Sequence, residues 1–120
     1  MHAVVRYLSS ADPGADPLEL YRPPADDHFC LSVVAVVGPS DGPGDETFQL
    51  TVCSPAWIAE HNRPKRFEFL RATLVVDEWD LELVRRAIGD LCLHATGETW
   101  HDVTTSLSRS MHWEFADYSP

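Results

Sequence analysis

Basic residues are scarce in this sequence, and their scarcity excludes several kinds of partner. The 120 residues include nine Lys and Arg against nineteen Asp and Glu, which gives a formal net charge of −10. A field of that sign repels nucleic-acid phosphates and anionic lipid headgroups, so we expect neither a nucleic acid nor a membrane as a partner. The partner that the charge favours is a basic one.

Long apolar runs and paired cysteines are also missing. No stretch approaches the ~20 apolar residues that span a bilayer, and the first residues lack the apolar core of a signal peptide. Cys30, Cys53 and Cys92 show no CxxC spacing, which favours buried, reduced thiols. Cys30 and Cys53 nevertheless lie near the open ends of two predicted strands, where they are placed to approach each other. We therefore expect a soluble, cytoplasmic protein.

Signatures of catalysis and of metal or phosphate binding are absent from the sequence. The six histidines match no zinc-ligand spacing, and there is neither a GxSxG motif nor a phosphate-binding loop with its lysine. We predict that the protein is not an enzyme and holds no cofactor and no metal. A pocket that placed His61, His94 or His112 beside a carboxylate and a nucleophile would argue for a small enzyme instead.

Residues 29–57 form the stretch on which we expect the rest of the chain to pack. Residues 29–37 are apolar except for Ser32 and rich in β-branched side chains, which favours a strand buried on both faces. A turn-rich stretch follows, and the alternation of apolar and polar residues after it completes a hairpin. Ser54 before Pro55 is typical of the N-cap of a helix, which we expect over about residues 55–62.

The segments around this hairpin are less uniform. Residues 2–8 predict an edge strand or a second central strand, and residues 67–76 predict a third long strand. Residues 9–27 are rich in proline and aspartate and predict an irregular excursion, which is either functional or weakly ordered. Residues 111–120 alternate in a way that fits a closing strand.

Two helices are expected in the C-terminal half. The apolar residues from Leu81 onward are spaced three or four apart, which indicates a helix over about residues 78–94 that begins at Asp77 and ends with Gly97 as a left-handed cap. A second helix is expected over about residues 98–109. The prediction is one α+β domain over residues 1–120, with a mainly antiparallel sheet on which the helices pack.

The most concentrated charge surrounds a tryptophan. Four acids, Asp77, Glu78, Asp80 and Glu82, stand with Trp79 within six residues. The segment is either an acidic helix start with a partly buried tryptophan, or an anionic patch with an aromatic anchor for a basic protein. The sequence alone leaves both interpretations open.

Several motifs in the same order resemble the immunity protein 8 family of bacterial polymorphic-toxin systems. The matching residues are Val37-Gly38-Pro39, the acidic loop to Glu46 and Phe48, Val52-Cys53-Ser54-Pro55-x-Trp57, Gly97-Glu98-Thr99-Trp100, and Leu107-Ser108-Arg109-x-x-His112-Trp113-Glu114-Phe115-x-Asp117-Tyr118. The resemblance implies a non-enzymatic α+β protein, made beside a toxin gene, that protects the cell by binding the toxin.

Charge then suggests how such a protein would act. An acidic protein fills or covers the basic groove of a toxin domain such as a nuclease. We hypothesise that the segment from Asp77 to Glu82 forms much of the contact surface, with Asp41, Asp45 and Glu46 at the hairpin tip as the second choice. We expect Trp57 and Trp100 to serve core packing. The alternative is a non-catalytic protein-interaction or oligomer-forming module unrelated to toxins, which could associate for example through the edge of the strand at residues 2–8.

Overall fold

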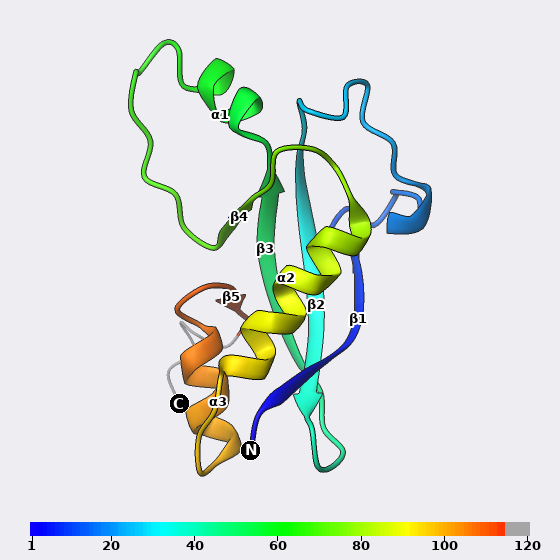
Figure 1. Cartoon of the computed structure of the whole chain (residues 1–120), viewed down its shortest axis with the longest axis vertical. Coiled ribbons are helices and arrows are strands. Elements are labelled where there is room, and N and C mark those ends of the chain that lie inside the picture. Colours follow the sequence, from blue (N-terminus) through cyan, green and yellow to red (C-terminus); the bar gives the residue numbers. More distant parts are fainter. Residues whose placement is uncertain (115–120) are drawn as a thin grey trace.

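The computed structural model describes residues 1–114, which fold into a five-stranded sheet with three α-helices (Figure 1). The strands are β1 (Ala3–Ser10), β2 (Cys30–Pro39), β3 (Glu46–Cys53), β4 (Thr73–Val75) and β5 (His112–Trp113). The helices are α1 (Pro55–His61), α2 (Leu81–His94) and α3 (Trp100–Leu107), with one turn of 3-10 helix at Leu18–Leu20. The predicted α+β class is confirmed.

The hairpin of β2 and β3 is the centre of the sheet. The strand order is β1-β2-β3-β4, and β5 pairs with β3 on the same edge that β4 uses further along. All pairs are antiparallel except β3 with β4, which is parallel. β1 is therefore an edge strand, which decides between the two predicted positions. In β2 the side chains of Val33 and Val37 are fully buried, whereas Ser32 is exposed.

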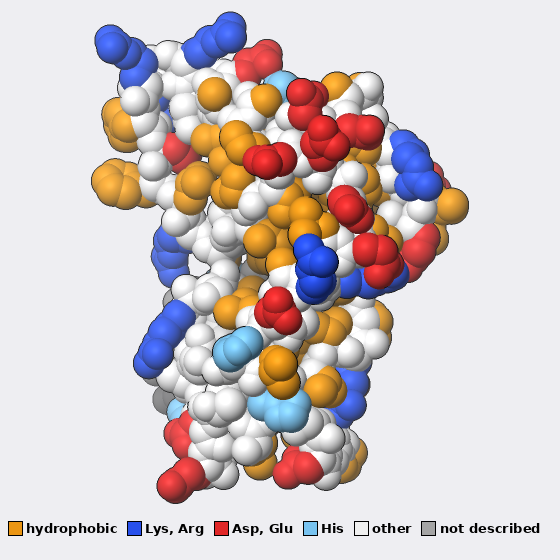
Figure 2. Space-filling view, in the orientation of Figure 1, with side chains coloured by type: hydrophobic (Ala, Val, Ile, Leu, Met, Phe, Trp, Pro, Cys, Tyr) orange, Lys and Arg blue, Asp and Glu red, His pale blue; other side chains and the backbone are white. Residues whose placement is uncertain are grey.

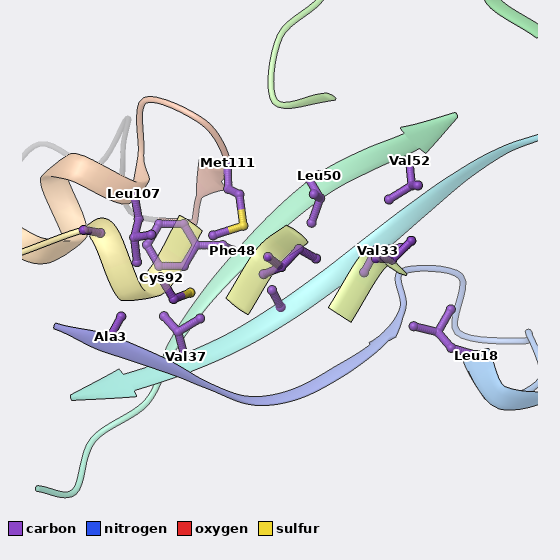
Figure 3. Packing of buried hydrophobic residues seen from close by; sticks show 14 of the residues in the cluster. Ala3, Leu18, Val33, Val37, Phe48, Leu50, Val52, Cys92, Leu107 and Met111 are labelled. Atoms are coloured by element: carbon purple, nitrogen blue, oxygen red, sulfur yellow. The ribbon is translucent and has the colours of Figure 1, made fainter. Parts of the chain in front are cut away.

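The core lies between the sheet and one face of α2 and α3. In Figure 1 α2 crosses in front of β2, and it contributes Val84, Ile88 and Cys92 to the buried cluster. Figure 3 shows the ring of Phe48 beside Leu107 and Met111. Phe48 comes from β3, Leu107 from α3 and Met111 from the segment before β5. Their contacts therefore join the central hairpin to the C-terminal part of the chain.

Ser54 begins α1 as predicted and also ties the helix to the hairpin. Its hydroxyl oxygen accepts hydrogen bonds from the backbone N–H of Trp57 at 3.3 Å and of Phe29 at 3.2 Å, and the side chain is fully buried. The bond to Trp57 satisfies one of the donors that a helix start leaves unpaired. The bond to Phe29 holds the start of β2 against the end of β3.

We expect Ser54→Ala to lower the free energy of unfolding by about 2 kcal/mol, because two backbone donors lose their acceptor in a buried place. Urea unfolding followed by circular dichroism measures the change. Ser110→Ala is the matched control, since Ser110 is exposed and its side chain has no hydrogen bond within residues 1–114. An equal cost for both substitutions would contradict the double role of Ser54.

The predicted third strand over residues 67–76 is wrong for most of its length. Only Thr73–Val75 pair with β3, at Thr51 to Cys53. The adjoining part of the same edge, at Phe48 and Gln49, is occupied by β5. Ala72 has a φ of 46°, so the chain turns away from the sheet just before β4. Competition for one sheet edge, which no local pattern reveals, removes the rest of the strand.

The predicted start of the long helix is also shifted. The N-cap of α2 is Asp80 and not Asp77: one carboxylate oxygen of Asp80 accepts hydrogen bonds from the N–H of Glu82 and Leu83 at 3.1 and 3.3 Å. The N–H of Trp79 instead donates to the carbonyl oxygen of Asp26 at 2.8 Å. This tertiary bond keeps residues 77–79 out of the helix.

Gly97 does not form the predicted left-handed cap. The C-cap of α2 is Ala95, and among the described glycines only Gly44 has a positive φ. A β-carbon on Gly97 would lie 2.4 Å from Cβ of Asp102. The glycine is thus explained by close packing against α3, whose N-cap Thr99 and Asp102 form a capping box.

Two further predictions concern residues 9–27 and residues 111–120. Within residues 9–27, the predicted irregular excursion, Leu18 is buried in the core and Leu20 is 63% exposed. Of the predicted closing strand, His112–Trp113 form β5, and the part beyond residue 114 lies outside the described residues.

Candidate functional site: an acidic surface at the start of α2

Acidic side chains gather over the start of α2 in the upper half of Figure 2. Two separate segments supply them: residues 77–82, and the turn that precedes β2. We define the acidic surface as six exposed side chains, Asp26, Asp27, Asp77, Glu78, Asp80 and Glu82. The hydrogen bond from the Trp79 N–H to the Asp26 carbonyl joins the two segments. Five of the predicted partner-binding residues therefore lie at or beside this surface.

Four of the six carboxylates have neither an ion pair nor a side-chain hydrogen bond with another described residue. Among residues 1–114, no ion pair includes Asp26, Asp27, Asp77 or Glu78. Carboxylates that neutralise no cation of their own chain project their field into solvent, where it acts on an approaching partner.

The other two carboxylates are engaged within the chain. Asp80 caps α2, and Glu82 contacts Arg85 at 2.6 Å. The same guanidinium contacts Glu19 at 2.8 Å, so two carboxylates share one cation. All three side chains are largely exposed, and such pairs stabilise a fold by only about 0–1 kcal/mol. The net charge of the acidic surface therefore remains negative.

Trp79 is held by the protein itself. Its ring makes edge-on contacts with Tyr21 at 4.9 Å and Phe29 at 5.5 Å between centroids, and the side chain is half-buried. Burial, followed by the neighbouring Cys30, raises the pKa of Tyr21. Trp79 is therefore partly buried, as the first interpretation of the segment expected, while the carboxylates on either side of it stay exposed.

The hairpin tip contains the second group of predicted residues, and two of the three already have contacts. The Asp45 carboxylate lies 3.6 Å from Nε of Arg6, and the indole N–H of Trp113 donates to Glu46 at 3.1 Å. Asp41 is exposed. Figure 1 places this tip and the start of α2 in opposite halves of the molecule, whose longest dimension is 43 Å. The two predicted groups therefore do not form one surface.

Asp26 and Asp27 are members of the acidic surface that sequence reasoning missed, because an acidic pair in a polar turn is ordinarily explained by solvation. The signal that could have found them is strand direction. Since β3 runs antiparallel to β2 and parallel to β4, the chain leaves β4 at the end of the sheet where β2 begins. The start of α2 must then lie beside the turn before β2.

One hollow bears on the enzyme alternative. It has a volume of about 210 Å³, lies beside α1, and is lined in part by Cys53, His61 and Glu68. Burial, then the neighbouring Cys30, raises the pKa of Cys53 to about 11, so this thiol stays protonated at neutral pH. His61 stacks on Trp57 at 4.5 Å, and within residues 1–114 no hydrogen bond links it to Cys53 or Glu68. The hollow assembles no nucleophile with its base.

The other two cysteines are not activated as nucleophiles either. Burial raises the pKa of Cys92 to about 11. Burial also raises the pKa of Cys30, and a hydrogen bond with Cys53 offsets part of that rise. Cys30 and Cys53 face each other in the register of the hairpin, as their spacing suggested, and both are free thiols. In the described part of the chain, no three His, Cys, Asp or Glu side chains are grouped to hold a metal ion. No helix in that part is both long and apolar enough to cross a membrane.

The fold and the surface define the class as an α+β protein whose prominent feature is an exposed, uncompensated acidic face. The match to known families agrees with that class. A model of the family described as Immunity protein 8 matches residues 4–118, so the chain belongs to this family. It is therefore an immunity protein of a toxin system. Neither the curated proteins nor the solved structures contain a match to the chain.

Proposed function

We propose that this immunity protein neutralises its cognate bacterial polymorphic toxin without catalysis, by placing the acidic surface over a basic groove of the toxin domain in the cytoplasm. The observation that carries the proposal is the set of four unpaired carboxylates, Asp26, Asp27, Asp77 and Glu78, on a protein of net charge −10. Opposite charges accelerate encounter and set the orientation of the complex.

A nuclease is the kind of toxin that best fits this surface. A protein that cleaves nucleic acid needs lysines and arginines along its substrate groove, because these residues neutralise phosphates. The exposed carboxylates beside Trp79 and the cap of α2 would present negative charge where the phosphates would otherwise lie. Binding would then exclude the substrate without altering the catalytic residues of the toxin. The hairpin tip, with Asp41, Asp45 and Glu46, remains the second candidate for the contact.

A growth-rescue assay tests the proposal. The C-terminal domain encoded by the adjacent reading frame is expressed in a heterologous bacterium, with and without this protein. We expect growth to stop with the toxin alone and to recover when both are present. Nucleic acid extracted before growth stops should be degraded only in the unprotected cells. Toxicity that this chain does not relieve would contradict neutralisation, and rescue with intact nucleic acid throughout would contradict the nuclease.

A further inference from the structure

The segment that joins α1 to β4, residues 62–72, presents large apolar side chains to solvent. Phe69 is 89% exposed, Phe67 is 64% exposed and Leu70 is 49% exposed. Within residues 1–114, no backbone hydrogen bond includes residues 67–70. Three large apolar side chains exposed within four residues are typical of contact surfaces. We call this segment the 62–72 loop.

The backbone holds the 62–72 loop in a defined place. Arg66 and Ala72 have φ angles of 68° and 46°, a left-handed conformation that residues with a β-carbon rarely adopt. Both ends are tied to the rest of the fold: the Asn62 N–H donates to the Ile58 carbonyl at 3.0 Å, and the Thr51 N–H donates to the Ala72 carbonyl at 2.9 Å. The apolar side chains are thus presented on an anchored loop.

The charge of the 62–72 loop is opposite to that of the molecule. Four of the nine basic residues of the chain lie in it, Arg63, Lys65, Arg66 and Arg71, and all four are exposed. Its one acid, Glu68, lies 3.9 Å from Lys65. In Figure 2 blue side chains stand out at the upper left, where Figure 1 draws the loop between α1 and β4, to one side of the acidic surface. A loop with exposed Phe and Arg fits an acidic partner that also offers apolar contact.

We propose that the partner is a second copy of this chain, and that the 62–72 loop of each copy binds the acidic surface of the other. The chain itself carries both complementary charges, and one two-fold axis pairs them in two equivalent contacts. The loop cations would meet the unpaired carboxylates of Asp77 and Glu78, so this dimer and the toxin complex proposed above would exclude each other. Phe67 and Phe69 would cover the exposed part of Trp79.

The oligomeric state of the full chain tests this proposal without any toxin. Sedimentation equilibrium should find a dimer at low ionic strength that dissociates as salt is raised from about 0.05 M to about 0.5 M, because screening weakens the exposed ion pairs. Replacing Phe67 and Phe69 together by serine should weaken dimerisation at every salt concentration.

Paired charge reversals identify the contact. Arg63→Glu with Lys65→Glu reverses the loop, and Asp77→Lys with Glu78→Lys reverses the acidic surface. Each double variant alone should raise the dimer dissociation constant at least about tenfold. An equimolar mixture of the two should dimerise again, because both contacts of the mixed pair are then complementary. Arg86→Glu with Arg109→Glu is the control of equal charge, outside the loop, and should leave the dimer intact.

Three results would overturn the proposal. The first is a wild-type chain that stays monomeric at low salt and high protein concentration. The second is a dimer that is insensitive to both charge reversals, which would place the interface elsewhere, for example at the edge of β1. The third is a mixture of the two reversed variants that stays monomeric. A monomer whose loop variants lose affinity for the toxin would assign the 62–72 loop to the toxin and not to a second copy.

Discussion

Reversing two charges, Asp77→Lys with Glu78→Lys, should abolish growth rescue at low expression of the immunity protein. Both carboxylates are exposed and unpaired within residues 1–114, so their replacement removes attraction and adds repulsion toward a basic toxin. Electrostatic steering of this kind changes association rate constants by about 10- to 1,000-fold, and the largest loss is expected at low salt. Stopped-flow mixing with a catalytically inactive toxin domain measures the association rate directly.

Asp77 and Glu78 are chosen so that a loss of binding cannot be attributed to a loss of stability. Asp80 is left unchanged because it caps α2, and Glu82 because it contacts Arg85. Substitutions at exposed sites without such contacts usually change stability by no more than about 0.5 kcal/mol. A thermal unfolding curve for the variant verifies that condition before binding is measured.

The matched control reverses the same number of charges at the opposite end of the molecule. Asp41→Lys with Asp45→Lys also removes the exposed Asp45–Arg6 ion pair, so the same unfolding curve checks its fold. At about 0.1 M salt it should leave the association rate within about threefold of the wild type, because charges beyond a Debye length of about 10 Å are then screened. If this control loses binding and the first variant retains it, the hairpin tip is the contact surface. If both variants bind normally, electrostatic occlusion of the toxin is wrong.

Phe48→Ala should be among the most destabilising single substitutions in the protein. The ring is fully buried, stacks on Trp113 at 6.3 Å between centroids, and lies beside Leu107 and Met111 in Figure 3. Removing a buried phenylalanine costs about 3–5 kcal/mol, since the lost contacts leave a cavity. For a domain of this size we expect the midpoint of thermal unfolding to fall by roughly 10–20 °C.

Phe69→Ala is the internal control for that experiment. It is the same substitution in the same chain, but the Phe69 side chain is 89% exposed, so we expect a change within about 0.5 kcal/mol. Urea unfolding at low protein concentration separates this intrinsic stability from any self-association. Similar losses for the two variants would mean that Phe69 is packed in solution and that the 62–72 loop is not exposed.

The contrast between Phe48 and Phe69 also marks how far sequence reasoning reaches. Both residues stand in segments that alternate in the manner of strands, and the sequence predicted a strand for each. The strand that contains Phe48 follows a long apolar strand after a turn-rich loop. Its pairing in a hairpin therefore follows from local signals. The fate of Phe69 depends on β5, which begins more than forty residues later and takes the edge of β3.

The candidate site divides in the same manner. The acidic run around Trp79 can be identified from the sequence alone, because counting charged residues does not require the fold. The contribution of Asp26 and Asp27 depends on a parallel β4 and on one tertiary hydrogen bond, from the Trp79 N–H to the Asp26 carbonyl. The shift of the helix start from Asp77 to Asp80 has the same origin. Local patterns predicted the elements and their charge, and contacts between distant segments decided their ends and neighbours.

The position of β5 has a consequence for synthesis of the protein. Glu46 and Trp113, which touch across the edge of β3, are 67 residues apart in the chain, and the fully buried Met111 immediately precedes β5. The ribosome therefore releases the central hairpin long before the residues that close its apolar face. During that interval Phe48 has only part of its final surroundings, so the nascent chain exposes the surface on which aggregation begins and on which chaperones act. We therefore expect only molecules in which Met111 and β5 have docked to be able to protect the cell.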